Sequence, residues 1–236
     1  IEVSPLLEIS SFKDWNAFNN WYWNLIRKQF ESSSEIRRKV HELTSGIEDD
    51  LGKVRAIYNF IVTDIRYNMW EFGVHGFKPY NAANIFARKF GDCKDKSTLA
   101  SVMLNEVGID AYPGLIDGTR QRSEEDLSLP LVNHFNHCIT YVPQRGDSLT
   151  EGIFLDGTAK YHSLDELPSM DRGARVLIVK PDGGELDTVE WNRPEDFFSL
   201  EETTIEIDED LSASYNTRDR KSVGEGKSVK HGGVRV

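Results

Sequence analysis

Hydrophobic residues recur at helical spacing along the first part of the chain. Between residues 12 and 26 an apolar side chain falls at every third or fourth position, which places these side chains on one face of a helix. Ser10 and Ser11 precede this run as candidate N-caps, so we expect an aromatic-rich helix of about 18 residues. Its tryptophans could form a carbohydrate or peptide platform, but docking of the helix on a larger body explains them more simply: Trp15, Trp21 and Trp23.

The same spacing predicts further helices as far as residue 104. One is expected over residues 35–43, and a longer one follows residue 49 with an apolar inner face of Leu51, Val54, Ile57, Tyr58, Ile61 and Ile65. Asn81 or Asn84 can cap a short helix that reaches Arg88. Another helix is expected to begin near Cys93, and its apolar positions are Leu99, Val102 and Met103. Between these helices, the glycine and aromatic residues of segment 67–80 indicate a structured loop.

The second half of the chain has the pattern of short strands. Strands are expected over residues 111–116, 131–142 (with one interruption), 152–156, 176–179 and 188–191, and at least one more over 203–215. Charged residues between 117 and 129 indicate a loop. Because helices come first and strands follow, the order favours an α+β fold with an antiparallel sheet over a parallel βαβ sheet.

Length and composition indicate the size of the core and the domain organisation, and they argue against some classes of partner. The chain has 236 residues, of which 39% are hydrophobic, enough for a substantial core. We expect a core domain with N-terminal helices over residues 1–200, and a C-terminal strand and basic tail over 201–236, the possible edge of a following β-domain. The net charge of -11 argues against a nucleic-acid partner, and no apolar run approaches the roughly 18 residues that span a membrane.

Cys93 is the first candidate for chemistry. It follows Gly91 and Asp92 at the expected start of a helix, where unpaired backbone N–H groups and the helix dipole favour an anion such as a thiolate. A small buried hydrophobic residue is the alternative interpretation, because that is the usual role of a lone cysteine. The two cysteines are too few for a disulfide scaffold and lack the spacing of a zinc site, so we expect no metal and no cofactor.

A histidine and an aspartate follow in the expected strands. Alternation along strand 131–142 puts His137 on one face and Cys138 on the other, where Cys138 would be a core thiol. His134 competes with His137, but it lies on the opposite face of a regular strand, and we favour His137. Asp156 ends the next strand, so an antiparallel neighbour can bring its carboxylate beside the histidine. Taken alone, Asp156 could equally start a turn before Gly157.

Three motifs together resemble the transglutaminase-like superfamily, and in particular its bacterial branch. They are Gly91-Asp92-Cys93-Lys94-Asp95-Lys96, Phe135-Asn136-His137 and Phe154-Leu155-Asp156-Gly157-Thr158, and the resemblance extends from Trp15 to Pro168. It implies a papain-like arrangement in which Cys93 is the nucleophile, His137 the base and acid, and Asp156 the orienting carboxylate. The backbone N–H of Cys93 would supply one oxyanion donor, and Tyr67 and Trp70 are candidates by position for the second donor or the substrate groove.

The expected function is therefore thiol-dependent acyl chemistry on a peptide or protein amide. With water as acceptor the protein would be a peptidase or amidase, and with an amine it would be a crosslinking acyltransferase. A non-catalytic binding module that keeps the fold, with Trp70 and Phe72 in a peptide groove, is the alternative, and a structural spacer is a third interpretation. The resemblance also implies a location in the periplasm, cell envelope or outside the cell, between flanking β-domains of a longer chain.

Overall fold

The computed structural model describes residues 7–119, 126–160, 162, 164, 166–191, 199–207 and 213–221. The chain forms two compact units, Ile1–Glu190 and Trp191–Val236. In the second unit, strand β8 (Ser199–Ile207) pairs antiparallel with β9 (Ala213–Lys221), so the region 203–215, where at least one strand was expected, belongs to a hairpin. Residues 222–236 of the predicted basic tail lie outside the described residues. The assignment of the first 200 residues to one domain stays a prediction.

The first unit is built on a five-stranded antiparallel sheet with strand order β5-β4-β3-β6-β7. Its strands are β3 (Tyr112–Ile116), β4 (His137–Val142), β5 (Ile153–Leu155), β6 (Arg175–Ile178) and β7 (Glu185–Thr188). A short 3-10 turn, η3 (Val132–His134), precedes β4 and is the expected interruption of segment 131–142. The predicted α+β class with an antiparallel sheet is confirmed.

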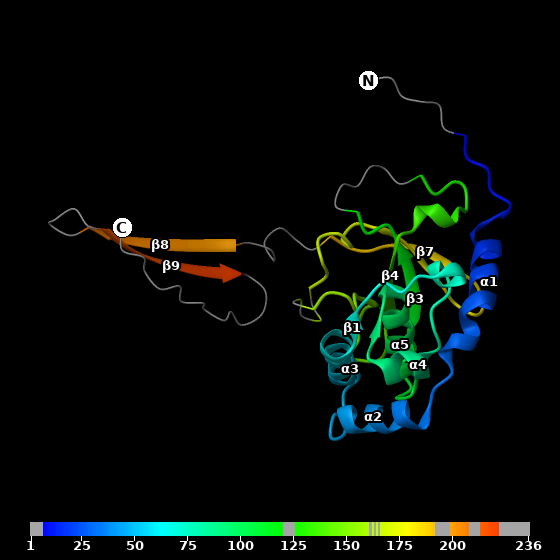
Figure 1. The fold of residues 1–236 in the computed structure, drawn as a ribbon, viewed down its shortest axis with the longest axis horizontal. Helices are drawn as coiled ribbons and strands as arrows, with labels where there is room; N and C mark the ends of the chain where they lie inside the picture. Colours follow the sequence, from blue (N-terminus) through cyan, green and yellow to red (C-terminus); the bar gives the residue numbers. More distant parts are fainter. Residues whose placement is uncertain are drawn as a thin grey trace. The chain divides into compact units, whose positions relative to one another are not determined.

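In the described part of the chain, the same unit contains the α-helices α1 to α5 (Figure 1). They are α1 (Trp15–Ile26), α2 (Ser34–Thr44), α3 (Asp50–Asp64), α4 (Ala82–Arg88) and α5 (Cys93–Asn105), among the described residues. Helix α1 is shorter than expected, because the chain tightens into the 3-10 turn η1 (Arg27–Phe30). The cap expected at Ser10 or Ser11 is wrong: Asp14 caps α1 by accepting a hydrogen bond from the N–H of Ala17 at 2.8 Å. None of the described helices is long and apolar enough to cross a membrane.

Helix α5 is the buried centre of the unit. Every residue from Cys93 to Leu104 is buried, although the first half of the helix is polar. Its partners include α3 and α4 on one side and strands β3 and β4 on the other, so α5 lies between the helices and the sheet (Figure 1). The alternation predicted for β4 also holds: Cys138 and Val142 pack toward the helices, whereas Ile139 packs in the cluster on the opposite face of the sheet.

Two buried hydrogen bonds fix α5 on β4. The Oγ of Ser97 donates to the carbonyl oxygen of Ile139 at 2.9 Å, and the Oγ1 of Thr140 donates to Ser97 Oγ at 3.0 Å. Ser97 lies one helical turn after Cys93, and Thr140 lies three residues after His137. This contact therefore sets the separation between the start of the helix and the start of the strand.

The loop before α5 is held by a short parallel pair and a buried carboxylate. Strand β1 (Arg66–Tyr67) pairs with β2 (Phe90–Gly91), which brings Tyr67 beside the start of α5. Asp95 Oδ2 lies 2.5 Å from a guanidinium nitrogen of Arg88, and Asp95 Oδ1 accepts from the N–H of Tyr80 at 2.8 Å. A Cβ added to Gly91 would lie 2.5 Å from Asp95 Cβ, so this close approach requires glycine.

We predict that Ser97→Ala destabilises the protein and displaces the start of α5. The substitution leaves the buried Ile139 carbonyl and Thr140 hydroxyl without their partner, which costs about 1–3 kcal/mol in the free energy of unfolding. Urea denaturation measures this loss. Ser34→Ala, at an exposed hydroxyl, is the control and should change stability by no more than about 0.5 kcal/mol. Equal stability of the two variants would contradict the structural role of Ser97.

Candidate active site

The candidate nucleophile Cys93 is the first residue of α5. Asp92 is the N-cap: its backbone is extended (φ -86°), and its side chain accepts from the N–H of Asp95 at 3.1 Å. The other carboxylate oxygen of Asp92 lies 2.6 Å from Lys94 Nζ, which also contacts Glu71 at 3.2 Å. The cap is thus a buried and neutralised ion pair, and Cys93 stands at the positive end of the helix dipole.

The strands bring His137 and Asp156 to this helix start. His137 opens β4 and Asp156 follows β5 directly, and the antiparallel register pairs Thr140 with Leu155. His137 Nε2 lies 3.3 Å from Asp156 Oδ2. Asp156 Oδ1 accepts from both the N–H and the hydroxyl of Thr158 at 2.7 Å, which orients the carboxylate. The adjacency inferred from strand pairing is therefore present in the structure.

The electrostatic environment favours a charged His137. Burial acts to lower its pKa, but hydrogen bonds to Asp156 and Cys93, together with their negative charges, raise the pKa from 6.5 to about 10. Burial acts to raise the pKa of Asp156, but the hydrogen bond and positive charge of His137 lower it below its usual value. Because Nε2 faces Asp156, Nδ1 is the ring nitrogen left for Cys93. The imidazole thus connects the sulfur and the carboxylate.

A second carboxylate lies beside the same imidazole. Asp171 is fully buried, and its Oδ1 is 3.9 Å from His137 Nε2. The hydrogen bond of Nε2 to Asp156 at 3.3 Å is poorly aligned, and Asp171 at 3.9 Å lies beyond hydrogen-bond distance. Asp171 could not be identified from the sequence, because it lies in a turn between strands, where aspartate is common and carries no separate signal.

The side chains of His137, Asp156 and Asp171 lie close enough together to be considered as a cation site. Ligand atoms of His137, Asp156 and Asp171 all lie within 4.8 Å of one another. However, both oxygens of Asp156 already accept hydrogen bonds from Thr158, and its Oδ2 contacts His137. The set fits an imidazole held by carboxylates, and we assign no metal to it.

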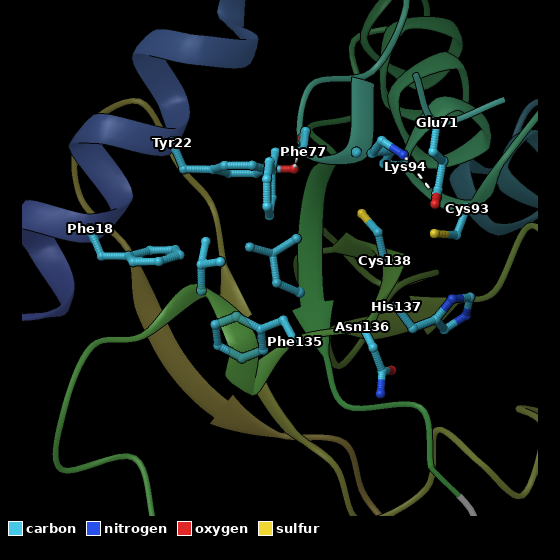
Figure 2. Close-up of a pocket in the computed structure, with 13 residues that line it drawn as sticks. Phe18, Tyr22, Glu71, Phe77, Cys93, Lys94, Phe135, Asn136, His137 and Cys138 are labelled. Atoms are coloured by element: carbon cyan, nitrogen blue, oxygen red, sulfur yellow. Dashed lines mark hydrogen bonds and ion pairs between the residues drawn. The ribbon is translucent and has the colours of Figure 1, made fainter. Parts of the chain in front are cut away.

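A pocket opens beside Cys93 and His137 (Figure 2). It has a volume of about 290 Å³ and extends between α1 and the sheet. Its aromatic walls are Phe18, Tyr22, Phe77 and Phe135, and its apolar floor includes Leu115, Val132 and Cys138. The hydroxyl of Tyr22 donates to the carbonyl oxygen of Phe77 at 3.0 Å, which joins α1 to the loop before α4.

The other two site residues predicted from the sequence are Tyr67 and Trp70. Burial and then the negative charges of Cys93 and Asp92 raise the pKa of Tyr67 to about 12, and the pairing of β1 with β2 puts Tyr67 opposite Gly91, two residues before Cys93. Trp70 stacks on Phe90 with centroids 5.4 Å apart, and it is not among the residues that line the pocket.

The competing histidine and the second cysteine lie outside the arrangement of sulfur, imidazole and carboxylate. His134 Nε2 lies 2.9 Å from the carbonyl oxygen of Leu129, within η3 and the segment before it, rather than beside Cys93. Cys138 packs in an apolar cluster with Phe18 and Tyr22, and burial raises the pKa of its thiol well above the usual value. The catalytic roles of Cys93, His137 and Asp156 stay a prediction, although the structure brings all three side chains together.

Comparison with known proteins supports the same fold. The family model of the transglutaminase-like superfamily matches residues 37–120, a range that includes Cys93 and ends before His137. A solved structure described as a "putative protease" from Parabacteroides distasonis ATCC 8503 aligns with 93% of this chain at a TM-score of 0.57 and 10% identity. The aligned part is 52% of that protein, so this chain spans about half of its length.

A second solved structure, described as a "putative cysteine protease" from Cytophaga hutchinsonii, aligns with 56% of this chain and 42% of its own, at a TM-score of 0.40 and 16% identity. No curated protein sequence matches the chain. The family match and the shared fold of the Parabacteroides protein confirm the resemblance inferred from the three motifs. Residues 37–120 of the chain match the transglutaminase-like superfamily, and the fold is similar to that of the Parabacteroides protein.

Proposed function

We propose that the protein performs cysteine-dependent acyl chemistry on a peptide or protein amide. The observation that carries this proposal is the single buried imidazole of His137, which contacts the Cys93 thiol on one side and the Asp156 carboxylate on the other. A cysteine nucleophile needs a base beside it and a third group that orients the base. The similarity of the fold to a protein described as a protease is consistent with this chemistry.

In the first step, Cys93 Sγ attacks the amide carbonyl carbon as a thiolate paired with the His137 imidazolium. The resulting oxyanion accepts hydrogen bonds from the N–H of Cys93 at the helix start and from the hydroxyl of Tyr67. The raised pKa of Tyr67 keeps this hydroxyl protonated at neutral pH, so it can donate. The C–N bond then breaks, the amine leaves with the proton of His137, and a thioester remains on Cys93.

In the second step, the acyl group passes to an acceptor. Water or an amine loses a proton to the neutral His137 as it attacks the thioester carbonyl, and the thiolate of Cys93 leaves. Asp156 keeps the imidazole in the orientation that both proton transfers require. Water gives peptidase or amidase activity, and an amine gives acyl transfer. Release of peptides from casein, compared with incorporation of a fluorescent alkylamine into casein, distinguishes the two.

We predict that Cys93 is alkylated by iodoacetamide at pH 7 about tenfold or more faster than glutathione, because His137 holds the thiolate. His137→Gln should remove most of this excess, whereas His134→Gln, three residues away and outside the site, should retain it. Stopped-flow alkylation with mass-spectrometric mapping of the adduct measures both rates. A Cys93 no faster than glutathione, or an equal loss in both histidine variants, would refute the activated nucleophile. It would favour a non-catalytic binding module.

A pH titration tests the electrostatics of the site separately. His137 has a folded-state pKa of about 10 against an ordinary value of 6.5, so the folded state holds this proton more tightly. The stability that this proton contributes is complete below pH 6.5 and is lost as pH rises through about 10.

We predict that nitrogen-15 NMR finds the His137 imidazole still protonated at pH 8. Asp156→Asn removes the charge that stabilises the imidazolium, so its titration midpoint should move to lower pH. Asp182→Asn, in the exposed turn after β6, is the matched control and should leave the midpoint unchanged. A midpoint near 6.5 in the unmodified protein would contradict the proposed ion pair.

A further inference from the structure

We infer that the pocket beside Cys93 binds an uncharged aromatic or branched aliphatic side chain of the substrate, next to the amide that Cys93 attacks. This inference rests on the proposed function and names its substrate class. The pocket is lined by Cys93 and His137 at one end and by the aromatic walls of α1 at the other (Figure 2). A side chain seated in it would therefore be attached to the part of the substrate that lies over the sulfur.

The size and walls of the pocket suit one large apolar side chain. Its volume of about 290 Å³ is near the lower end of ligand pockets, which begin at about 300 Å³, so it suits a side chain rather than a whole cofactor. Phe18 and Tyr22 are almost completely buried and give the far wall a fixed shape, and their neighbour Phe135 presents another ring. Aromatic side chains bind other rings edge-to-face or offset, which favours an aromatic guest.

The charged and polar side chains of the lining are already engaged. Lys94 is held by Asp92 at 2.6 Å and by Glu71 at 3.2 Å, so its charge is balanced before a substrate arrives. The side-chain amide of Asn136 donates to Asp117 Oδ1 at 2.5 Å and accepts from the N–H of Gly118 at 2.8 Å. An acidic substrate side chain would lose its hydration in this pocket without gaining a cationic partner, because Lys94 is already paired. A basic side chain would be surrounded mainly by apolar and aromatic walls, with Glu71 as the carboxylate at the lining.

The loop that supplies Glu71 and Phe77 to the pocket is itself apolar and exposed. Between residues 67 and 77 it exposes large hydrophobic side chains to solvent: Tyr67, Met69, Trp70, Phe72, Val74 and Phe77. Exposed apolar groups of this extent are typical of a binding surface. This surface adjoins the start of α5 through the β1–β2 pair, so it is placed to contact an apolar peptide on either side of the seated side chain.

A pair of alkylating reagents tests the pocket independently of turnover. For each thiol, the measured quantity is the rate of alkylation by N-benzyl-iodoacetamide divided by the rate by iodoacetamide. We expect this ratio to be about tenfold higher for Cys93 than for glutathione, because the ring is buried in the pocket. Val132→Phe fills the pocket and should bring this ratio to within about threefold of that for glutathione. Val107→Phe makes the same change at a partly exposed valine beyond the C-terminal end of α5, outside the lining, and should retain the preference. If Val132→Phe does not fold, Phe77→Ala, which removes a half-exposed wall, should also lower the ratio.

The ratio is read within one protein, so the activation of Cys93 cancels from it. If both reagents alkylate Cys93 quickly and the ratio of their rates equals that for glutathione, the pocket inference is overturned. The proposed acyl chemistry would still stand. Slow alkylation by iodoacetamide with a retained benzyl preference would refute the activated nucleophile and support the pocket. Loss of the preference in Val107→Phe as well as in Val132→Phe would count against the assigned position of the ring.

A different observation supports a second inference: the geometry points to Asp171 as a positioning residue for His137. The imidazole Nε2 lies 3.3 Å from Asp156 and 3.9 Å from Asp171, between two buried carboxylates. With Cys93, these are the ionisable groups that face the ring, and Tyr58 and Arg172 lie close enough to Asp171 to interact with its charge. The negative charges of two buried carboxylates beside Nε2 attract the imidazolium and so favour this orientation of the ring.

Single and double variants test this role through Cys93 alkylation by iodoacetamide. If both carboxylates hold the ring, Asp171→Asn lowers the rate severalfold at pH 7 and moves the onset of alkylation to higher pH. The Asp156→Asn, Asp171→Asn double variant should then lose more than the product of the two single losses. Unchanged rate and pH profile in Asp171→Asn, or purely multiplicative losses, would overturn the role. Asp171→Ser serves if Asp171→Asn does not fold, and a change in melting temperature alone would indicate a structural role only.

Discussion

The candidate site depends on the contact between Ser97 of α5 and the backbone and side chain of β4. The hydrogen bonds to Ile139 and from Thr140 are buried, so water cannot replace them, and they fix the helix along the strand. Because a helix and a strand are stiff, this one contact also fixes their ends, where Cys93 and His137 lie. Apolar packing alone would hold the two layers together but would allow small sliding movements between them.

Burial of a charged segment is the second constraint. The run from Asp92 to Lys96 has the composition of a solvent-exposed helix start, yet each of these residues is buried. Asp92 is paired with Lys94, Asp95 with Arg88, and Lys96 donates to the carbonyl oxygen of Ile65 at 2.5 Å. Arg88 ends α4 and Ile65 follows α3, so the ends of both helices must be in place before this helix start can be buried. The apolar residues that follow at helical spacing predict the helix, but they do not indicate that its charged start needs partners from other segments.

Local chemistry explains what could be predicted from the sequence. The helix starts at Asp49, Asn81 and Asp92, the alternation along β4 and the order of Cys93, His137 and Asp156 follow from capping and periodicity. Features that depend on distant segments could not be predicted in this way. Asp171 and the walls Phe18 and Tyr22 reach the site only because a turn and a helix dock against the sheet. The incorrect cap of α1 has the same origin, because Ser10 instead donates to the carbonyl oxygen of Pro130, 120 residues away.

The hydrogen bond from Tyr22 to Phe77 has a consequence for how such a domain can diversify. It closes the pocket with a helix that precedes residue 37, where the superfamily match begins. Phe18 and Tyr22, two walls of the proposed substrate pocket, are therefore encoded apart from Cys93, His137 and Asp156. Under the proposed function, substitutions in α1 could change which side chain the pocket accepts without altering these three residues. The N-terminal helix would then set the selectivity of a site whose proposed reactive groups come from α5 and the sheet.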